Sequence, residues 1–289
     1  MTGEAKVNGH DEPYWLGRAT EEQQRLIKQH YIWTKAIGYL LHPAVARSLP
    51  EKNARIADVG TGTGVWLAEM AKVSPSTYTF NGYDISPDQF LPKEALPENV
   101  TLELGDFWKP FPEELQGQFD LVNIRLIIIS MGEGVWEKTL RNVLTLLKPG
   151  GAVQWTEGNF LIARGFRGSS PESTPGHHLT RGQKHFNATL VKRFKWCYPE
   201  WQSMFEDAGL ARVEEDVLST DRLPEQRPNF TEIGLGAVFH GLANLSKIKE
   251  EGYWSADEVA QAKQKALEDK SSGAYLRWDL NVTVGFKQE

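Results

Sequence analysis

The sequence contains a single cysteine, Cys197, among its 289 residues. One cysteine cannot form an internal disulfide, and a zinc site built from several cysteines is excluded as well. The chain also has no excess of positive charge, because 32 Lys and Arg residues stand against 38 Asp and Glu residues, a net charge of −6. The electrostatic signature of a nucleic-acid-binding protein is therefore missing.

Long apolar runs are missing too. The longest, residues 126–129, is far shorter than the roughly 20 residues that a membrane-spanning helix requires. Residues 1–10 are polar and lack the apolar stretch of a secretory signal. No recognisable pattern of metal ligands is found, so no metal is expected. These absences predict a soluble, reduced, cytoplasmic protein that binds neither membranes nor nucleic acids.

Aromatic residues, in contrast, are numerous. The chain has 10 Trp, 13 Phe and 8 Tyr residues within a composition that is 40% hydrophobic and 24% charged. The overall balance is that of a globular protein with an ample core. The aromatic residues indicate either a pocket for a flat apolar ligand or only a large core.

Strands and helices are expected to alternate between residues 52 and 157. Strands are expected over residues 55–59, 78–83, 100–104, 119–124 and 152–155. Helices are expected over residues 65–73 and 135–147. Such alternation predicts a parallel sheet with right-handed crossovers. Two further strands are expected over residues 212–218 and 278–286.

Two parts of the chain are expected. Residues 1–50 form a polar tail and a helical cap, with Gly38 as a break and Pro43 as the start of a second helix. Residues 51–289 form a Rossmann-like α/β domain. Within it, segments at about 160–195 and 222–250 are expected as insertions that cover a substrate.

The most informative stretch follows the first expected strand and runs from Asp58 to Gly64, with glycines at 60, 62 and 64. Glycines let the chain turn sharply and let a ligand approach the backbone. The spacing does not match the G-x-G-x-x-G pattern of dinucleotide sites. Asp58 would also repel a pyrophosphate on this turn. A cationic ligand without phosphate, such as S-adenosylmethionine with its sulfonium and ammonium groups, is favoured instead.

Two more acidic residues follow later strands. Asp84 ends the second strand, 20 residues after Gly64, where a carboxylate can accept hydrogen bonds from ribose hydroxyls. Ile85 could pack on an adenine ring. Asp106, followed by Phe107, stands after the third strand, within reach of an adenine amino group. Asp106 could instead cap the turn that follows it.

These motifs resemble those of class I S-adenosylmethionine-dependent methyltransferases. The resemblance rests on the segment 58–64, on Asp84 and Asp106, and on the Leu-Lys-Pro-Gly-Gly run at 147–151. It covers residues 52–157 closely. Residues 14–18, together with Asn123-Ile124-Arg125 and Gln154-Trp155, look similar to fungal secondary-metabolite methyltransferases.

The resemblance implies a seven-stranded, mostly parallel sheet whose last strand is antiparallel. It implies that Gly60, Gly62 and Gly64 cradle the methionine part of the cofactor and that Asp58 binds its amino group. Asp84 would hold the ribose. The same resemblance assigns the following residues to the cofactor site or its vicinity: Tyr14, Ile85, Asp106, Phe107, Asn123 and Arg125.

Methyl transfer from a sulfonium has a good neutral leaving group, so the main task of the protein is alignment. A base is needed only where the nucleophile must lose a proton. The candidate catalytic residues are Glu157 after the fifth strand, His178 in the 160–195 segment, and Arg125. Further candidate bases are His177 and His185 in the same segment, His30 in the cap, and His240. Arg125 could equally be a structural ion-pair partner.

The sequence thus predicts a methyltransferase that modifies an oxygen or nitrogen atom of a small, apolar or aromatic, specialised metabolite. A homodimer is compatible with this reading. Two alternatives stay open. A methyltransferase fold can be reused for a pericyclic or elimination reaction without methyl transfer. It can also serve as a non-catalytic regulatory protein.

Overall fold

The computed structural model describes residues 20–167, 177–248 and 252–288. The chain divides into two compact units. We call residues 18–157, 199–217 and 281–289 the sheet unit, and residues 1–17, 158–198 and 218–280 the helical unit. The division falls inside three strands, at residues 157/158, 217/218 and 280/281. Tyr14 lies outside the described residues.

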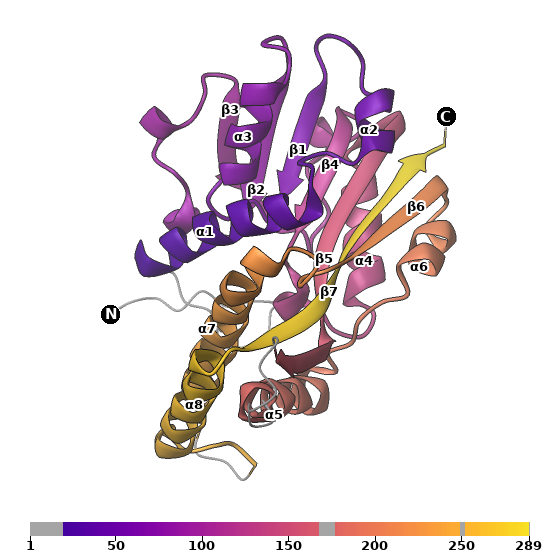
Figure 1. Cartoon of the computed structure of the whole chain (residues 1–289). Coiled ribbons are helices and arrows are strands. Elements are labelled where there is room, and N and C mark those ends of the chain that lie inside the picture. Colours follow the sequence, from indigo (N-terminus) through magenta and orange to yellow (C-terminus); the bar gives the residue numbers. More distant parts are fainter. Residues whose placement is uncertain (1–19, 168–176, 249–251, 289) are drawn as a thin grey trace. The chain divides into compact units, whose positions relative to one another are not determined.

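A seven-stranded sheet forms the framework of the sheet unit. Its strands are β1 (Arg55–Val59), β2 (Thr79–Asp84), β3 (Val100–Leu104), β4 (Phe119–Arg125), β5 (Leu147–Arg167), β6 (Leu210–Ser219) and β7 (Ala274–Lys287). The order is β3-β2-β1-β4-β5-β7-β6, and the neighbours from β3 to β5 pair in parallel. Figure 1 shows the arrow of β7 pointing opposite to that of β1. The predicted α/β fold, with an antiparallel last strand, is confirmed.

Helices of the sheet unit are α1 (Thr20–Ile37), α2 (Pro43–Ser48), α3 (Val65–Val73), α4 (Val135–Leu144) and α6 (Trp201–Asp207). The predicted break at Gly38 is confirmed: its φ is +97°, a left-handed value that favours glycine. Pro43 starts α2, where its missing N–H removes no helical hydrogen bond. Short 3₁₀ turns η1 (Pro87–Gln89) and η4 (Ile128–Ser130) follow β2 and β4.

The core of the sheet unit has two sides. On one side, α2 and α3 cover the sheet, and Val45, Trp66 and Leu67 pack with Ile56 and Leu121 in one buried cluster. The other side holds three tryptophans from α4, β5 and α6. The rings of Trp136, Trp155 and Trp201 lie 5.4–5.7 Å apart, centroid to centroid. Such pairs stabilise a core beyond the area that they bury.

The helical unit contains α5 (His177–Phe194), α7 (Arg227–Leu245) and α8 (Ala256–Ser271), which pack on one another. Glycines let the helices approach: a Cβ on Gly182 would stand 2.8 Å from the Phe239 ring, and one on Gly241 would stand 2.6 Å from the Phe186 ring. Phe230 packs edge-on against the buried Trp278. For these aromatic residues the packing alternative is what the structure shows.

The segment after residue 157 differs from its prediction. Sequence analysis found no clear strand there, yet β5 continues to Arg167 and α5 begins at His177. The sequence gives no strand signal there, because polar and glycine residues within 163–167 interrupt the apolar pattern. Leu161, Ile162 and Phe166 are all exposed, so apolar and buried positions do not alternate cleanly. β7 likewise begins at Ala274, four residues before the expected start.

Candidate active site

The polar residues singled out from the sequence gather where the parallel strands end. Asp58 precedes the last residue of β1, Asp84 ends β2 and Arg125 ends β4. Parallel pairing brings the carboxyl ends of these strands to one edge of the sheet. In open α/β sheets this edge is where ligands bind.

The glycine turn after β1 has the backbone that the sequence predicts. Gly60, Gly62 and Gly64 have φ values of +70°, +55° and +79°, all in the left-handed region. Close packing adds a second reason for glycine. A Cβ on Gly60 would stand 2.8 Å from Ile127 Cγ2, and one on Gly64 would stand 2.7 Å from Leu102 Cδ1. At Gly60 and Gly64 a larger residue would therefore require Ile127 and Leu102 to shift.

Asp58 is buried and anchors a polar ladder across three strands. In register, Asp58 of β1 pairs with Asn123 of β4, which pairs with Gln154 of β5. Asn123 Nδ2 donates to Asp58 Oδ1 at 2.7 Å, and Gln154 Nε2 donates to Asn123 Oδ1 at 3.1 Å. Thr61 Oγ1 donates to Asp58 Oδ2 at 2.6 Å. The carboxylate is thus fixed beside the glycine turn.

Burial raises the pKa of Asp58 from its ordinary value to about 6, against the hydrogen bonds of Thr61 and Asn123, which lower it. The buried, hydrogen-bonded carboxylate is therefore mostly ionised at pH 7. A cation placed beside it would lower the pKa further and bind favourably. A carboxylate in this state offers the hydrogen-bond acceptor that an ammonium group, which only donates, requires.

Asp84 holds the same turn from the side of β2. Its Oδ2 accepts the backbone N–H of Gly62 at 2.8 Å, and its Oδ1 accepts that of Ser86 at 3.2 Å. Asp84 thus stands next to the glycine turn and fixes its backbone. Ile85, the next residue, is half-buried.

Asp106 and Phe107 have different surroundings. Asp106 Oδ1 accepts the N–H of Trp108 at 3.0 Å, and its Oδ2 pairs with Lys109 at 2.9 Å. Asp106 therefore does cap the turn that follows it. The Phe107 ring reaches the glycine turn, since its Cε1 would stand 3.7 Å from a Cβ on Gly60.

Arg125 contacts His30 of α1. An Arg125 Nη nitrogen lies 2.9 Å from His30 Nδ1, which accepts this hydrogen bond because the guanidinium is always a donor. Burial, together with the charges of Arg125 and Lys72, lowers the pKa of His30 to about 3. The imidazole is neutral at pH 7. Burial also lowers the pKa of Arg125 to about 10, a value at which it stays charged.

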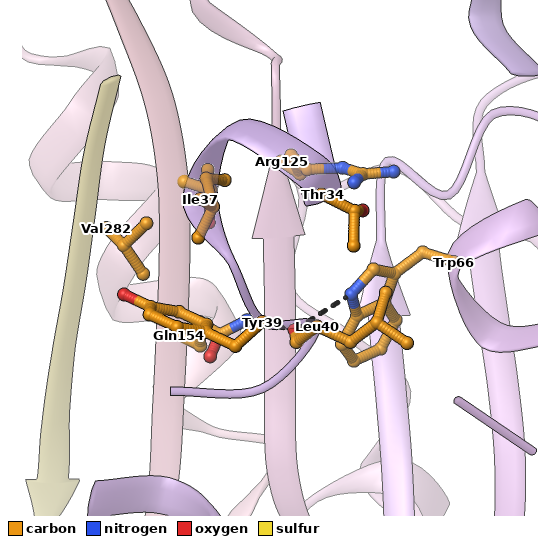
Figure 2. A pocket seen from close by; sticks show the side chains of 9 residues that line it. Thr34, Ile37, Tyr39, Leu40, Trp66, Arg125, Gln154 and Val282 are labelled. Atoms are coloured by element: carbon orange, nitrogen blue, oxygen red, sulfur yellow. Dashed lines mark hydrogen bonds between the residues drawn. The ribbon is translucent and has the colours of Figure 1, made fainter. Parts of the chain in front are cut away.

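Arg125 also lines a small cavity, together with Thr34, Tyr39, Trp66 and Gln154 among others. Figure 2 shows Arg125 and Thr34 close together, and the indole nitrogen of Trp66 directed at the carbonyl of Leu40, to which it donates at 3.2 Å. The cavity measures about 10 Å³. This volume suits about one water molecule and is far too small for a cofactor.

Glu157 is fully buried in β5. Its Oε1 accepts the backbone N–H of Ile127 at 2.8 Å and the indole N–H of Trp155 at 3.1 Å. Burial raises the pKa of Glu157 to about 8, against these hydrogen bonds and the charge of Arg125. The carboxyl group is therefore mostly protonated at pH 7, which leaves little of the basic form.

His178 lies in α5 of the helical unit, whereas Arg125 and Glu157 belong to the sheet unit. Its role stays a prediction. Sequence analysis gave Gln154 and Thr61 no place in the site, although both are buried and bonded into the ladder. The available signal was a polar residue at the inward position of two buried strands, Asn123 and Gln154.

Neither a metal site nor a membrane-spanning helix is found in the described residues. Within residues 20–167, 177–248 and 252–288, no group of three or more His, Cys, Asp and Glu side chains is placed to hold a metal ion. None of the helices in these ranges is long and apolar enough to cross a membrane.

Comparison with known proteins identifies related chains. A family model described as a methyltransferase domain matches residues 30–215. N-methyltransferase tcpN of Claviceps purpurea is 32% identical over 255 residues, which cover 83% of this chain and 76% of that protein. Methyltransferase grgD of a Penicillium species is 36% identical over 152 residues, or 50% of this chain and 52% of that one. The match with grgD thus spans only about half of that relative's length.

Among solved structures, phosphoethanolamine N-methyltransferase 2 of Haemonchus contortus, in complex with phosphomonomethylethanolamine and S-adenosylhomocysteine, aligns with a TM-score of 0.52. The alignment covers 95% of this chain and 59% of that chain at 17% identity, so it shows a shared fold alone. The family model covers more than half of the sequence, and tcpN is similar over most of it. The chain therefore belongs to the class I S-adenosylmethionine-dependent methyltransferases.

Proposed function

We propose that this chain transfers the methyl group of S-adenosylmethionine to a nitrogen or oxygen atom of a small specialised metabolite. The observation that carries the proposal is the buried Asp58 carboxylate, fixed by Thr61 and Asn123 beside the left-handed glycine turn. When bound, S-adenosylmethionine supplies an electrophilic methyl group on a sulfonium. The residues of this chain bind and orient it.

The site residues fit the parts of this cofactor. Asp58 is proposed to face the ammonium group, because a fixed carboxylate with a pKa of about 6 favours a cation. Gly60, Gly62 and Gly64 would bring the backbone close to the methionine part. Asp84, whose carboxylate holds the backbone of the glycine turn at the end of β2, is proposed to accept from the ribose hydroxyls.

The ring of Phe107, beside Gly60, is proposed to contact the adenine. Ile85 is proposed to pack on the same adenine. Asp106 is proposed to accept from the adenine amino group at an acceptor position beyond those that Trp108 N and Lys109 use. We assign Asn123 to positioning, since its amide is engaged by Asp58 and Gln154. Tyr14 stays a predicted cofactor contact.

The proposed nucleophile is an amine or another group that needs no strong base from the sheet unit. His30 is neutral and has a pKa of about 3, so it is a poor proton acceptor at pH 7. Glu157 is mostly protonated and fully buried. The relative tcpN is named as an N-methyltransferase, which supports nitrogen as the acceptor atom.

Isothermal titration with S-adenosylmethionine tests the cofactor assignment. We expect Asp58→Asn and Asp84→Asn to raise Kd about tenfold or more, the loss expected when a charged hydrogen-bond partner is removed. Asp120→Asn is the matched control, because Asp120 lies at the opposite end of β4 and binds Arg55 N and Lys148. Equal effects at Asp120 and Asp58 would contradict the assignment.

Methyl-labelled S-adenosylmethionine incubated with a fungal metabolite extract tests the reaction. The proposal expects a metabolite that gains one labelled methyl group in the mass spectrum. A rearranged product without added mass would instead indicate a pericyclic or elimination reaction. Binding without any product would favour a regulatory protein.

A further inference from the structure

We infer that Glu157 is a positioning residue: it fixes the turn after β4, and through Ile127 it fixes the glycine turn and so the affinity for the cofactor. The inference rests on the proposed function, because it concerns the same site. It gives Glu157 a different task from that of a general base, which would have to contact the acceptor itself.

The turn after β4 begins where the pairing of β4 with β5 ends. Arg125 is the last residue of β4 that pairs with β5, opposite Thr156. Leu126 N still donates to Thr156 O at 3.0 Å. The chain then turns away, and the next N–H, of Ile127, is taken by the Glu157 side chain at 2.8 Å. The Glu157 carboxyl group thus accepts the first backbone N–H beyond the end of the ladder.

The turn itself is strained. Leu126 has φ +59°, in the left-handed region, which costs an L-residue with a branched side chain about 1–2 kcal/mol. Such a conformation persists only where the surroundings hold it. Hydrogen bonds on both sides hold this one, from Leu126 N to β5 and from Ile127 N to Glu157.

The turn after β4 packs against the glycine turn of the proposed cofactor site. The side chain of Ile127 lies against Gly60, close enough that a Cβ there would stand 2.8 Å from Ile127 Cγ2. A shift of Ile127 therefore opens or closes space directly at the glycine turn. Arg125, one residue before the turn, would lose its fixed place beside His30 at the same time.

Glu157 is itself held in place by Trp155. Its Oε1 also accepts the indole N–H of Trp155, whose ring packs between Trp136 and Trp201 in the aromatic cluster on that side of the sheet. The other oxygen, Oε2, is buried and has no hydrogen-bond partner among the described residues. Oε1 makes these two hydrogen bonds, and the backbone N–H of Ile128 also interacts with the carboxyl group and lowers its pKa. A neutral group with one acceptor oxygen can keep the two bonds of Oε1.

Two variants separate this role from that of a base. Glu157→Gln keeps the reach and one acceptor oxygen but cannot take up a proton. Glu157→Asp keeps the carboxylate but is one methylene too short to reach Ile127 N. We expect titration with S-adenosylmethionine to give a Kd within about twofold of the unmodified chain for the Gln variant. The Asp variant should raise Kd about tenfold, a change that corresponds to about 1.4 kcal/mol. The reverse order would overturn the inference.

Amide hydrogen exchange provides a readout that needs no cofactor. Exchange at Ile127 should accelerate about tenfold in Glu157→Asp and stay unchanged in Glu157→Gln. Adding Leu126→Gly to Glu157→Asp removes the strain and should recover at least part of the lost affinity. Equal exchange rates in all variants, or no recovery by glycine, would refute the inference. If the unmodified chain binds no S-adenosylmethionine, the proposed function fails, and exchange at Ile127 still decides the role of Glu157.

Discussion

The polar ladder predicts that Asn123→Leu both destabilises the protein and changes how its cofactor site titrates. Leucine has nearly the shape of asparagine, so the change removes hydrogen bonds and opens little space. Two bonds disappear, from Nδ2 to the Asp58 carboxylate at 2.7 Å and from Gln154 to Oδ1 at 3.1 Å. Asn123 is only 1% exposed, so water cannot replace them.

The magnitude follows from the two bonds. A buried hydrogen bond to a charged group contributes about 1.5–3 kcal/mol, and one between neutral groups contributes about 0.5–1.5 kcal/mol. Gln154 keeps its bond to the carbonyl of Leu40, which limits the loss on that side. We therefore expect the free energy of unfolding to fall by about 2–4 kcal/mol.

The change also moves the pKa of Asp58. The bond from Asn123 lowers that pKa, and burial has already raised it to about 6. Its removal shifts the pKa upward, so that less of the carboxylate is ionised at pH 7. Under the proposed role of Asp58, S-adenosylmethionine binds to the ionised form. As the pH is lowered, the affinity should therefore begin to decline at a higher pH in the variant than in the unmodified chain.

Urea unfolding and calorimetric titration between pH 5 and pH 8 measure both effects (roughly the range around the pKa of Asp58). Thr139→Val is the matched control, because the Thr139 hydroxyl is fully buried and has no hydrogen-bond partner in the described part of the chain. That swap should change stability by less than about 1 kcal/mol. If Asn123→Leu is no worse than Thr139→Val, and the pH dependence of binding is unchanged, the ladder is not what holds Asp58.

Three further predictions concern other parts of the molecule. Gly60→Ala should destabilise the chain by about 1–3 kcal/mol and weaken S-adenosylmethionine binding, because it combines a φ of +70° with a contact of 2.8 Å to Ile127; thermal unfolding and titration measure this. Ser255→Ala should cost about 1 kcal/mol in urea unfolding with unchanged cofactor Kd, since Ser255 and Glu258 form the capping box of α8. The pKa of Glu157 is raised from an ordinary 4.5 to about 8, so the folded state holds this proton more tightly, and stability from this group falls as pH rises from about 4.5 to 8. Glu157→Gln should flatten that slope in urea unfolding at several pH values, and an unchanged slope would assign it to other groups.

Much of the fold was readable from the sequence, because it is encoded in local patterns. Buried parallel strands appear as short apolar runs, and β1 occupies the residues expected for it. The glycines at 60, 62 and 64 predict a sharp turn, and the structure gives all three positive φ values. Where the pattern was weak, the prediction was weak: the extension of β5 to Arg167 carries exposed apolar residues and gave no alternation.

The sequence by itself determined the α/β fold and the glycine turn with its acidic neighbours Asp58 and Asp84. The spacing of the strands along the chain places both acidic residues at the carboxyl ends of neighbouring strands. Only the tertiary structure decided what those side chains do. Strand register joined Asp58 to Asn123 across 65 residues and Asn123 to Gln154 across 31 residues, and packing gave Glu157 the N–H of Ile127. A hydrogen-bond partner depends on distance in space, and one sequence fixes that distance only after every strand has found its neighbour.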